Sequence, residues 1–542
     1  MYIPLTCNTD GSHLRSQTKV NALVEFAIQH ELPAIGICDY NLSQSISFYK
    51  RCKEKGIKPI IGCEFHIGGL CFVAYAKSTS GWIDLLALYS MIYGAKEDRS
   101  PESIIPFLTD NLVYILISEC PKKIREILTG FSHVYDGFDP IRNLSKTLEF
   151  PRTLITPNWF LRKEDHHLNN VLQSMSFNKP INKCEFPSKN NSDYRVLLAN
   201  DMEISAGHLI TNEEIVSGIE DIEILHKPKL PNFDCEDENE FLRELCRAGF
   251  IKRGFSSIDS KYVERITHEL DIIKQAGMAG YFLVVQDLIN YGKSNGFLFG
   301  IGRGSAGGCL ISYLIGITEI DPIKYGLSFE RFYSADRSGL PDIDIDLEPE
   351  ARDFLVEYAK NRYGADKFAQ LATFNTLKGA ASIRACMRSS PKGISASEQN
   401  DISKILPKEG VIAPELVDQE KQIGSKSLLL WALINEPDKL KRWCEYKDGV
   451  YEGVYAEEFQ QAVELNGVIQ SRGRHASAFV LCGDPLIKMA PVVYDDHAQE
   501  PIIGVDMHSA EDVGLVKIDL LGLDLLTKSK SIYRMVTNEC VI

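Results

Sequence analysis

The chain has 542 residues, 44% of them hydrophobic and 25% charged, a balance that is ordinary for a globular protein and predicts two to four domains. The net charge of −15 disfavours a simple nucleic-acid coat protein, because phosphate binding rewards dense positive charge, but it leaves room for a DNA enzyme with a local basic surface. The sequence begins without a basic segment and apolar stretch, and no run approaches the roughly 18 apolar residues of a membrane span. We therefore expect a cytoplasmic protein without a secretory signal.

The 14 cysteines could indicate a metal site or disulfides, so their spacing matters. They fall singly along the chain, with no C-x-x-C pair, which disfavours a zinc ribbon or finger. Several lie in apolar stretches, such as Gly36-Ile37-Cys38, where a thiol behaves as a small buried hydrophobic group. We expect reduced, structural cysteines.

The N-terminal region alternates helical and strand patterns. Apolar spacing predicts a helix over 20–30, a buried strand over 34–38, a helix through 48–50 and a second strand over 58–62. Strand, helix and strand with short connections are typical of a parallel α/β unit.

The remainder of the chain is more helical. The stretch 181–237 is polar and rich in Asn, Pro and Asp, so we expect a domain boundary within 205–230. Helical spacing then predicts one helix from residue 262 and another over 281–291. The segment of about 380–470 is largely helical by pattern and interrupts two stretches with strand character.

An alternation of acidic and apolar residues, Pro-Asp-Ile-Asp-Ile-Asp over 341–346, is the sharpest feature of the sequence. Its period of two is that of a β-strand and places Asp342, Asp344 and Asp346 on one face. Three like charges on one face repel each other, and Asp is depleted in strands, so a divalent cation such as Mg²⁺ is the natural compensation. An acidic surface strand without a ligand is the structural alternative.

A matching acid occurs late in the chain, in Gly-Leu-Val-Lys-Ile-Asp-Leu-Leu-Gly over 514–522. Here Lys517 and Asp519 interrupt an apolar, strand-like run, and a buried charge is costly unless it is paired or bound to metal. If this strand lies beside the first, Asp519 completes a cluster of three carboxylates able to hold two metal ions. Taken alone, Asp519 is more typical of a strand end or a cap.

A glycine-rich loop over 300–308 follows an expected strand over 297–299 and precedes an apolar run. Backbone N–H groups of such a loop can bind anions. Its glycines also match G-x-G-x-x-G, with Glu319 and Asp321 following, so a dinucleotide-binding fold is a rival. Arg303 inside the loop and the acidic strand beyond it favour a triphosphate cradle beside a metal site instead.

Basic residues gather in one window, 360–390, which holds six Lys and Arg against one Asp. A solvated helix face would give the same composition. Further cations stand at Arg331, between two phenylalanines, and in the run Ser-Arg-Gly-Arg-His over 471–475.

Six motifs in this order resemble the bacterial replicative DNA polymerases of family C, the polymerase III alpha subunits. They are Ala-Gly-Tyr-Phe-Leu-Val-Val-Gln-Asp, Gly-Arg-Gly-Ser-Ala-Gly, Glu-Arg-Phe, Pro-Asp-Ile-Asp-Ile-Asp, Ala-Thr-Phe-Asn-Thr and Gly-Leu-Val-Lys-Ile-Asp-Leu-Leu-Gly-Leu. They span about 250 residues, and the N-terminal region more weakly resembles that family's polymerase-and-histidinol-phosphatase (PHP) domain.

The resemblance implies a multidomain fold of the α/β and α+β classes. The expected parts are a PHP-type βα barrel-like domain over 1–215, a palm of the nucleotidyltransferase, polymerase β-like type over 216–373 and 475–542, and a helical thumb over 374–474 inserted in the palm.

Site residues follow from the same resemblance, position by position. It implies that Asp342, Asp344 and Asp519 are catalytic and hold two Mg²⁺ ions, with Asp346 in support. It further implies nucleotide-binding and DNA-binding residues: Gly302, Arg303, Gly304, Ser305, Arg331 and Lys517 for the nucleotide, and Lys378, Arg384, Arg388, Arg474 and His475 for DNA.

Two departures from the family pattern stand out. Metal-dependent PHP domains begin with a His-x-His strand, where this chain has Thr6-Cys7-Asn8, and a later Asp-x-His pair reads Asn158-Trp159-Phe160. Asp39 and Glu64 remain, so we expect most metal ligands, and with them phosphoesterase activity, to be lost. The family's fingers, clamp-binding segment and OB-fold module would lie beyond residue 542.

The expected function is therefore two-metal transfer of a nucleotide from dNTP to the 3′-hydroxyl of a primer on template DNA. The expected partners are primer–template DNA and a second polypeptide that supplies the fingers and C-terminal modules and, through them, the sliding clamp; no membrane is involved. A catalytically silent DNA-binding fragment or the N-terminal half of a split polymerase is the alternative. A nicotinamide-dependent oxidoreductase is a weaker rival.

Overall fold

The computed structural model of the chain describes residues 2–96, 99–138, 150–156, 158–184, 196, 206–256, 260–334 and 340–537. The chain forms two compact units, and each is described by itself. One comprises Met1–Ile92, Glu97–Glu223 and Thr373–Gly473, and the other comprises Tyr93–Lys96, Ile224–Ala372 and Arg474–Ile542. Part of the polar stretch 181–237 lies outside the described residues.

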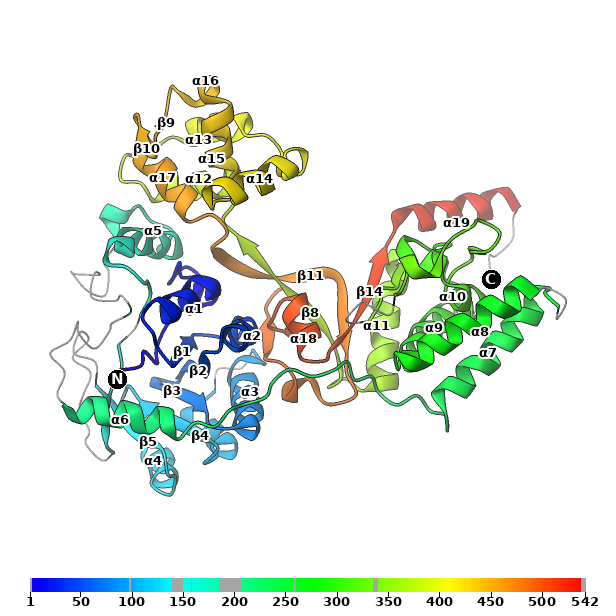
Figure 1. Cartoon of the computed structure of the whole chain (residues 1–542), viewed down its shortest axis with the longest axis horizontal. Helices are drawn as coiled ribbons and strands as arrows, with labels where there is room; N and C mark the ends of the chain where they lie inside the picture. Colours follow the sequence, from blue (N-terminus) through cyan, green and yellow to red (C-terminus); the bar gives the residue numbers. More distant parts are fainter. Residues whose placement is uncertain are drawn as a thin grey trace. The chain divides into compact units, whose positions relative to one another are not determined.

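A six-stranded curled sheet forms the centre of the first unit, with strands in chain order from β1 to β6 and helices arranged around it (Figure 1). The strands are β1 (Ala34–Asp39), β2 (Lys58–Ile67), β3 (Leu70–Ala76), β4 (Leu112–Leu116), β5 (Val134–Phe138) and β6 (Arg152–Leu154). The helices are α1 (Val20–Gln29), α2 (Ser45–Lys55), α3 (Thr79–Tyr93), α4 (Lys122–Leu128), α5 (His166–Phe177) and α6 (Ala206–Ser217). The pairing of β1 with β2 is parallel, which confirms the predicted α/β start.

The extended segment at the N-terminus continues this sheet toward a barrel. On one side, the N–H groups of Gly36 and Cys38 in β1 donate to the carbonyls of Pro4 and Cys7, each at 2.8 Å. On the other side, Asn8 N–H donates to the carbonyl of Asn158 at 2.9 Å. The segment is buried, and the hydrogen bonds along both of its edges pair backbone groups that would otherwise be costly to bury.

The region 373–473 folds as a helical group in the same unit. Its elements are α12 (Gly379–Ser389), α13 (Ala396–Ile405), α14 (Ala413–Ile423), α15 (Leu428–Asn435), α16 (Pro437–Leu440), α17 (Ala456–Glu464), β9 (Glu445–Lys447) and β10 (Val450–Glu452). Three residues of α5, Leu168, Val171 and Leu172, belong to its hydrophobic core. Lys19 Nζ also donates to the carbonyl of Asn466 at 2.8 Å. The helical region therefore packs on the N-terminal domain, which the sequence did not indicate.

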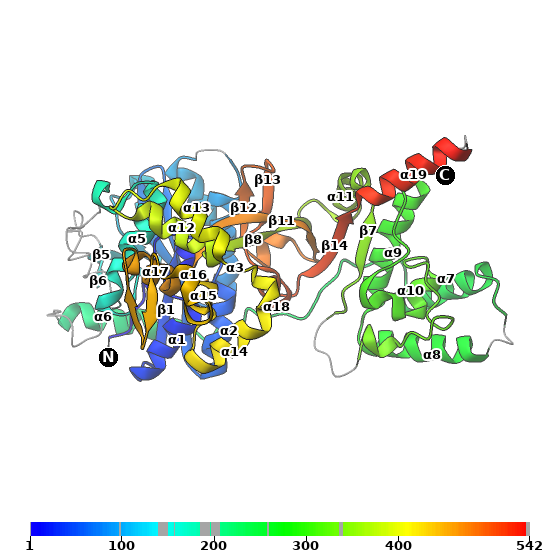
Figure 2. The ribbon, with the colours of Figure 1, turned by 90° about the horizontal axis from the view of Figure 1, so that it is seen from above.

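The second unit combines a sheet with a cluster of helices. The sheet has the order β12-β13-β8-β11-β14-β7, and Figure 2 shows α7 to α10 gathered beside β7 and β14. Its strands are β7 (Asp344–Leu347), β8 (Phe368–Thr376), β11 (Ile469–Leu481), β12 (Val492–Asp495), β13 (Glu500–Ile503) and β14 (Val516–Gly522). Its helices are α7 (Glu238–Lys252), α8 (Ser260–Gln275), α9 (Ala279–Ser294), α10 (Leu310–Leu314), α11 (Pro349–Tyr363), α18 (Met507–Asp512) and α19 (Asp524–Thr537).

One hydrophobic core joins the edge of this sheet to the helices. Ile343, Ile345 and Ile518 are buried in the same cluster as Phe282 of α9 and Leu310 of α10. The buried face of β7 and β14 is thereby fixed against helices, and the polar face is left on the other side of the strands. Among the described residues, no helix is long and apolar enough to cross a membrane.

The close approach of the N-terminal segment to β1 generates a test of the fold. A Cβ atom at Gly36 would lie 2.1 Å from the backbone oxygen of Leu5, so Gly36→Ala must push two paired backbone segments apart. We expect a loss of about 1–3 kcal/mol in the free energy of unfolding, measured by denaturant titration. The control is Gly410→Ala, because a Cβ there meets nothing within 4 Å. Equal stabilities of the two variants would contradict the close packing.

Candidate active site

Two acidic strands lie side by side at the edge of the second sheet. β14 pairs with β7 in parallel, and the register places Asp519 directly opposite Asp344 and Leu521 opposite Asp346. Neighbouring strands are about 4.8 Å apart, so the carboxylates of Asp519 and Asp344 share one small region. The predicted meeting of these two acids is thus found in the structure.

The alternation of the Asp-Ile-Asp-Ile-Asp run is also observed. Ile343 and Ile345 are buried, whereas Asp342 is exposed and Asp344 and Asp346 are partly exposed. The regular strand begins only at Asp344, and Ile343 N–H donates to the hydroxyl of Tyr281 at 3.1 Å. Tyr281 therefore fixes the backbone beside Asp342 where the sheet does not.

Two cations lie among the four carboxylates and offset half of their negative charge. Lys517 Nζ lies 2.9 Å from Asp519 Oδ2 and 3.5 Å from Asp342 Oδ1. Arg303 Nη2 lies 3.3 Å from Asp344 Oδ1, and its Nε lies 3.5 Å from Asp346 Oδ1. Each cation therefore bridges two acids.

Burial and neighbouring charges shift the pKa values of Lys517 and Asp346. Burial by itself lowers the pKa of Lys517, but the hydrogen bond to Asp519 and the charges of Asp519 and Asp342 together raise it. Burial raises the pKa of Asp346, and the neighbouring charge of Asp344 adds to this, against the effect of Arg303. Lys517 is thus held protonated, and Asp346 takes up a proton more readily than an ordinary aspartate does.

Two buried carboxylate oxygens of the cluster, Asp519 Oδ1 and Asp346 Oδ1, accept no hydrogen bond from the described residues. Oδ2 of Asp519, by contrast, contacts Lys517. A buried acceptor without a partner is costly, and a hard divalent cation would satisfy it. The donor set of Asp342, Asp344 and Asp519 therefore fits Mg²⁺.

The glycine-rich loop lies over the carboxylate face. A Cβ on Gly304, whose φ is +65°, would lie 3.3 Å from Asp344 Oδ2, and one on Gly300 would lie 2.8 Å from the Cβ of Asp346. Arg303 and Gly304 are exposed, and Gly302 and Ser305 are partly exposed. Glycine lets the loop approach the acids closely while Arg303 stays accessible to a ligand.

The structure does not support the dinucleotide-binding alternative. In the expected strand over 297–299, Phe299 forms only an isolated bridge, with Leu347, and the helix after the loop is the five-residue α10. Glu319, the candidate ribose ligand, instead contacts Arg253 at 2.7 Å and Lys293 at 2.8 Å. The parallel strand–helix–strand unit that a dinucleotide fold needs is not found there.

The remaining predicted residues of this unit lie on the surface. Arg331 is exposed at the end of a 3₁₀ turn over Phe329–Arg331. Arg474 on β11 is exposed and lies 3.9 Å from Glu500. His475 is partly exposed, and its Nδ1 accepts the N–H of Ala478 at 2.8 Å, so one side of the ring serves the local backbone.

The predicted DNA-binding residues Lys378, Arg384 and Arg388 belong to the first unit. All three are exposed. Lys378 is the N-cap of α12, and Arg384 and Arg388 lie along one stripe of the helix, whereas Ile383 and Met387 are buried on a neighbouring face. The basic window 360–390 therefore includes an exposed helix face, which is required both of a DNA-binding surface and of a merely solvated helix.

Neutral residues fill the positions of the His-x-His and Asp-x-His patterns in the N-terminal domain: Thr6, Asn8 and Asn158 are polar, and Phe160 is apolar. Asn158 Nδ2 donates to the hydroxyl of Thr6 at 3.3 Å, and Asn8 Nδ2 donates to Ser12 Oγ at 3.4 Å. Asp39, whose pKa burial raises to about 7, accepts the N–H of Thr9 at 2.7 Å and the hydroxyls of Thr9 and Ser12. A polynuclear metal centre built on His-x-His does not fit this hydrogen-bonded network.

Two groups of residues escaped the sequence reasoning. Tyr281 lies in the motif Ala-Gly-Tyr-Phe-Leu-Val-Val-Gln-Asp, but the sequence did not predict that its hydroxyl accepts the N–H of Ile343. Glu64, His66 and Cys71 come together in the first unit, and the spacing Glu-x-His followed by Cys across a Gly-Gly turn could have indicated this.

The bridging position of Lys517 generates a prediction about metal binding. In Lys517→Met, no ammonium competes with a divalent cation for Asp519 and Asp342. We expect Mn²⁺ to bind without nucleotide about tenfold more tightly, measured by electron paramagnetic resonance titration. The control is Lys528→Met, since Lys528 is exposed on α19. Unchanged or weaker Mn²⁺ binding in Lys517→Met would show that the lysine does not occupy the cation position.

Known protein families match both the N-terminal region and the region that contains the acidic strands. The family model described as the bacterial DNA polymerase III alpha NTPase domain matches residues 240–522, and the PHP domain model matches residues 5–209. Curated relatives called DNA polymerase III subunit alpha are 29% identical in Aquifex aeolicus, over 98% of this chain and 52% of that protein, and 28% identical in Bacillus subtilis, over 99% and 50%. The chain spans about half the length of these relatives.

The first of these models covers more than half of the chain and includes both acidic strands and the glycine-rich loop. The N-terminal curled sheet is accordingly a PHP domain, and the second unit contains the α/β domain of the polymerase type. The chain belongs to the bacterial DNA polymerase III alpha family.

Proposed function

We propose that this chain provides the nucleotidyl-transfer site of a replicative DNA polymerase, with Asp342, Asp344 and Asp519 as its metal ligands. The observation that carries the proposal is the register of β7 and β14, which sets Asp344 opposite Asp519 with two basic residues beside them. Two Mg²⁺ ions bound there would activate the primer 3′-hydroxyl and neutralise charge on the triphosphate.

The two basic residues bind and orient the nucleotide in this proposal. Arg303 is 45% exposed in its side chain, and Lys517 is 13% exposed, so the first can swing toward a ligand while the second is held in place. Triphosphate oxygens replace the carboxylates as partners of Arg303, for which planar bidentate contact with phosphate is favourable. Gly302, Gly304, Ser305 and Arg331 complete the proposed triphosphate contacts.

Duplex DNA is the proposed partner of the basic helix α12. Arg384 and Arg388 are four residues apart, so they project from one face of the helix at a spacing that suits consecutive phosphates. A hollow in the same unit, lined by Arg388, Lys179 and Gln470, extends this face. Lys378, Arg474 and His475 are the further proposed DNA contacts.

The proposed domain roles follow the family order. Residues 1–215 form the PHP-like domain with most metal ligands lost, 216–373 and 475–542 form the palm, and 374–474 form the thumb.

A second polypeptide is also part of the proposal. It would supply the fingers and C-terminal modules, and the sliding clamp would be reached through it. The exposed Arg384 and Arg388 of α12 would also suit the second candidate, a catalytically silent DNA-binding fragment. Primer extension separates the two, because only the first predicts incorporation of dNTP.

The sharpest test of the enzyme proposal is Asp344→Asn, which keeps shape and removes charge. We expect primer extension with Mg²⁺ and dNTP, assayed together with any polypeptide encoded immediately downstream, to fall at least about 10³-fold, equivalent to about 4 kcal/mol. The matched control is Asp353→Asn, because the Asp353 side chain is 92% exposed on α11. Extension by Asp344→Asn at the control's rate would refute the metal-ligand role, and no extension by the wild type would favour the silent fragment.

A further inference from the structure

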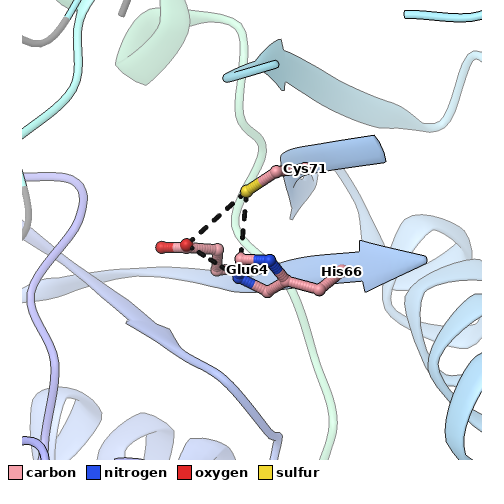
Figure 3. A group of neighbouring side chains, drawn as sticks. All are labelled: Glu64, His66 and Cys71. Atoms are coloured by element: carbon pink, nitrogen blue, oxygen red, sulfur yellow. Dashed lines mark hydrogen bonds and ion pairs between the residues drawn. The ribbon is translucent and has the colours of Figure 1, made fainter. Parts of the chain in front are cut away.

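The hairpin of β2 and β3 in the PHP domain carries three metal-ligating side chains on one face (Figure 3). Glu64 and His66 are two residues apart on β2, so their side chains point to the same side of the sheet. Across the hairpin, His66 pairs directly with Cys71 of β3. Strand geometry alone therefore brings a carboxylate, an imidazole and a thiol together.

The turn of this hairpin holds the three residues in register. Gly68 and Gly69 connect Ile67 to Leu70, with φ values of +51° and +85°. A two-residue turn with both φ angles positive matches the twist of paired strands and admits little slippage. The N–H of Cys71 also donates to Ser118 Oγ at 2.7 Å, and the ring of Tyr40 stacks on His66 with centroids 5.6 Å apart.

The distances between the ligand atoms fit a single ion. His66 Nε2 lies 3.0 Å from Glu64 Oε1, and Cys71 Sγ lies 3.7 Å from Glu64 Oε1 and 3.8 Å from His66 Nε2. Ligands about 2.0–2.3 Å from a tetrahedral ion are separated by roughly 3.3–3.6 Å. The three atoms thus form a triangle of nearly the size that one ion requires.

Hydrogen bonding accounts less well for this arrangement. The Glu64 side chain is 7% exposed, and its Oε1 lies 3.0 Å from the imidazole Nε2 and 3.7 Å from the thiol sulfur. A thiol is a weak donor and gives little compensation for a buried carboxylate. A divalent cation bound to the thiolate, the imidazole and the carboxylate would offset the negative charges of the thiolate and the carboxylate.

The donor types define the class of ion. Thiolate and imidazole prefer zinc-class transition metals, whereas the hard Mg²⁺ of a polymerase site prefers oxygen. The His66 side chain is 52% exposed, which leaves the fourth position open to solvent. This site lies in the other unit from Asp342, Asp344 and Asp519, and its existence does not depend on the proposed polymerase activity.

We propose that Glu64, His66 and Cys71 form a mononuclear site for a zinc-class divalent ion, with water at the fourth position. The ion ties the β2–β3 hairpin together on the face of the sheet that carries these three side chains. The ligand set differs from the His-x-His pattern, since all three of its members come from the hairpin and none belongs to that pattern.

Cobalt provides a spectroscopic test with the whole chain. We expect Co²⁺, added alone to the metal-stripped protein under reducing conditions, to produce a thiolate-to-cobalt charge-transfer band that saturates at one equivalent and that Zn²⁺ abolishes. Cys71→Ser should lose the band, and Glu64→Gln should weaken Co²⁺ binding about tenfold or more. The control is Cys235→Ser, which alters a partly exposed cysteine of the other unit and should keep the band.

Thermal unfolding gives a second, independent readout. Zn²⁺ in excess should raise the unfolding midpoint of the wild type and of Cys235→Ser, and leave that of Cys71→Ser unchanged, because an ion bound only to the folded state stabilises it. A band that survives Cys71→Ser, or the lack of a one-equivalent band in the folded wild type, would overturn the proposal.

Discussion

The repulsion among four carboxylates at the edge of one sheet is the constraint on which the second unit depends. Two such charges about 5 Å apart repel by about 3 kcal/mol at the effective dielectric near a protein surface, and the register of β7 and β14 sets Asp344 and Asp519 at about this distance. Lys517 and Arg303 each bridge two of the acids and offset this cost. The same cations suit a triphosphate, so one arrangement stabilises the free chain and prepares it for a nucleotide.

Several neighbouring features follow from that constraint. The glycine-rich loop must come close enough for Arg303 to reach two acids, which is why Gly304 lies over Asp344 without a side chain. The apolar sides of both strands are anchored in a helical core, and Tyr281 holds Ile343 where the strand is not yet regular. In the PHP domain a different solution is found, because the buried Asp39 accepts hydrogen bonds from the backbone N–H of Thr9 and from the hydroxyls of Thr9 and Ser12.

Local patterns predicted much of this from the sequence. The period-two alternation of 341–346 gave the buried and polar faces, and the apolar run around Asp519 indicated a strand. The partners of Lys517 and Arg303 could not be predicted, because they depend on the register between strands about 175 residues apart. The packing of 373–473 on α5 escaped prediction for the same reason, because it arises from contacts between segments far apart in the sequence. The cluster around Cys71 is different, since it lies in one hairpin whose local spacing could have indicated it.

The central claim is that Asp342, Asp344 and Asp519 form one metal site, from which Arg303 turns toward a nucleotide while Lys517 is held in place. A crystal structure with Mn²⁺ and a non-hydrolysable dNTP tests it most directly, because anomalous scattering locates the ions. The account predicts two anomalous peaks among these three carboxylates, with Arg303 turned from Asp344 to the triphosphate. Peaks elsewhere, or a bound nucleotide with Arg303 still on Asp344, would contradict it.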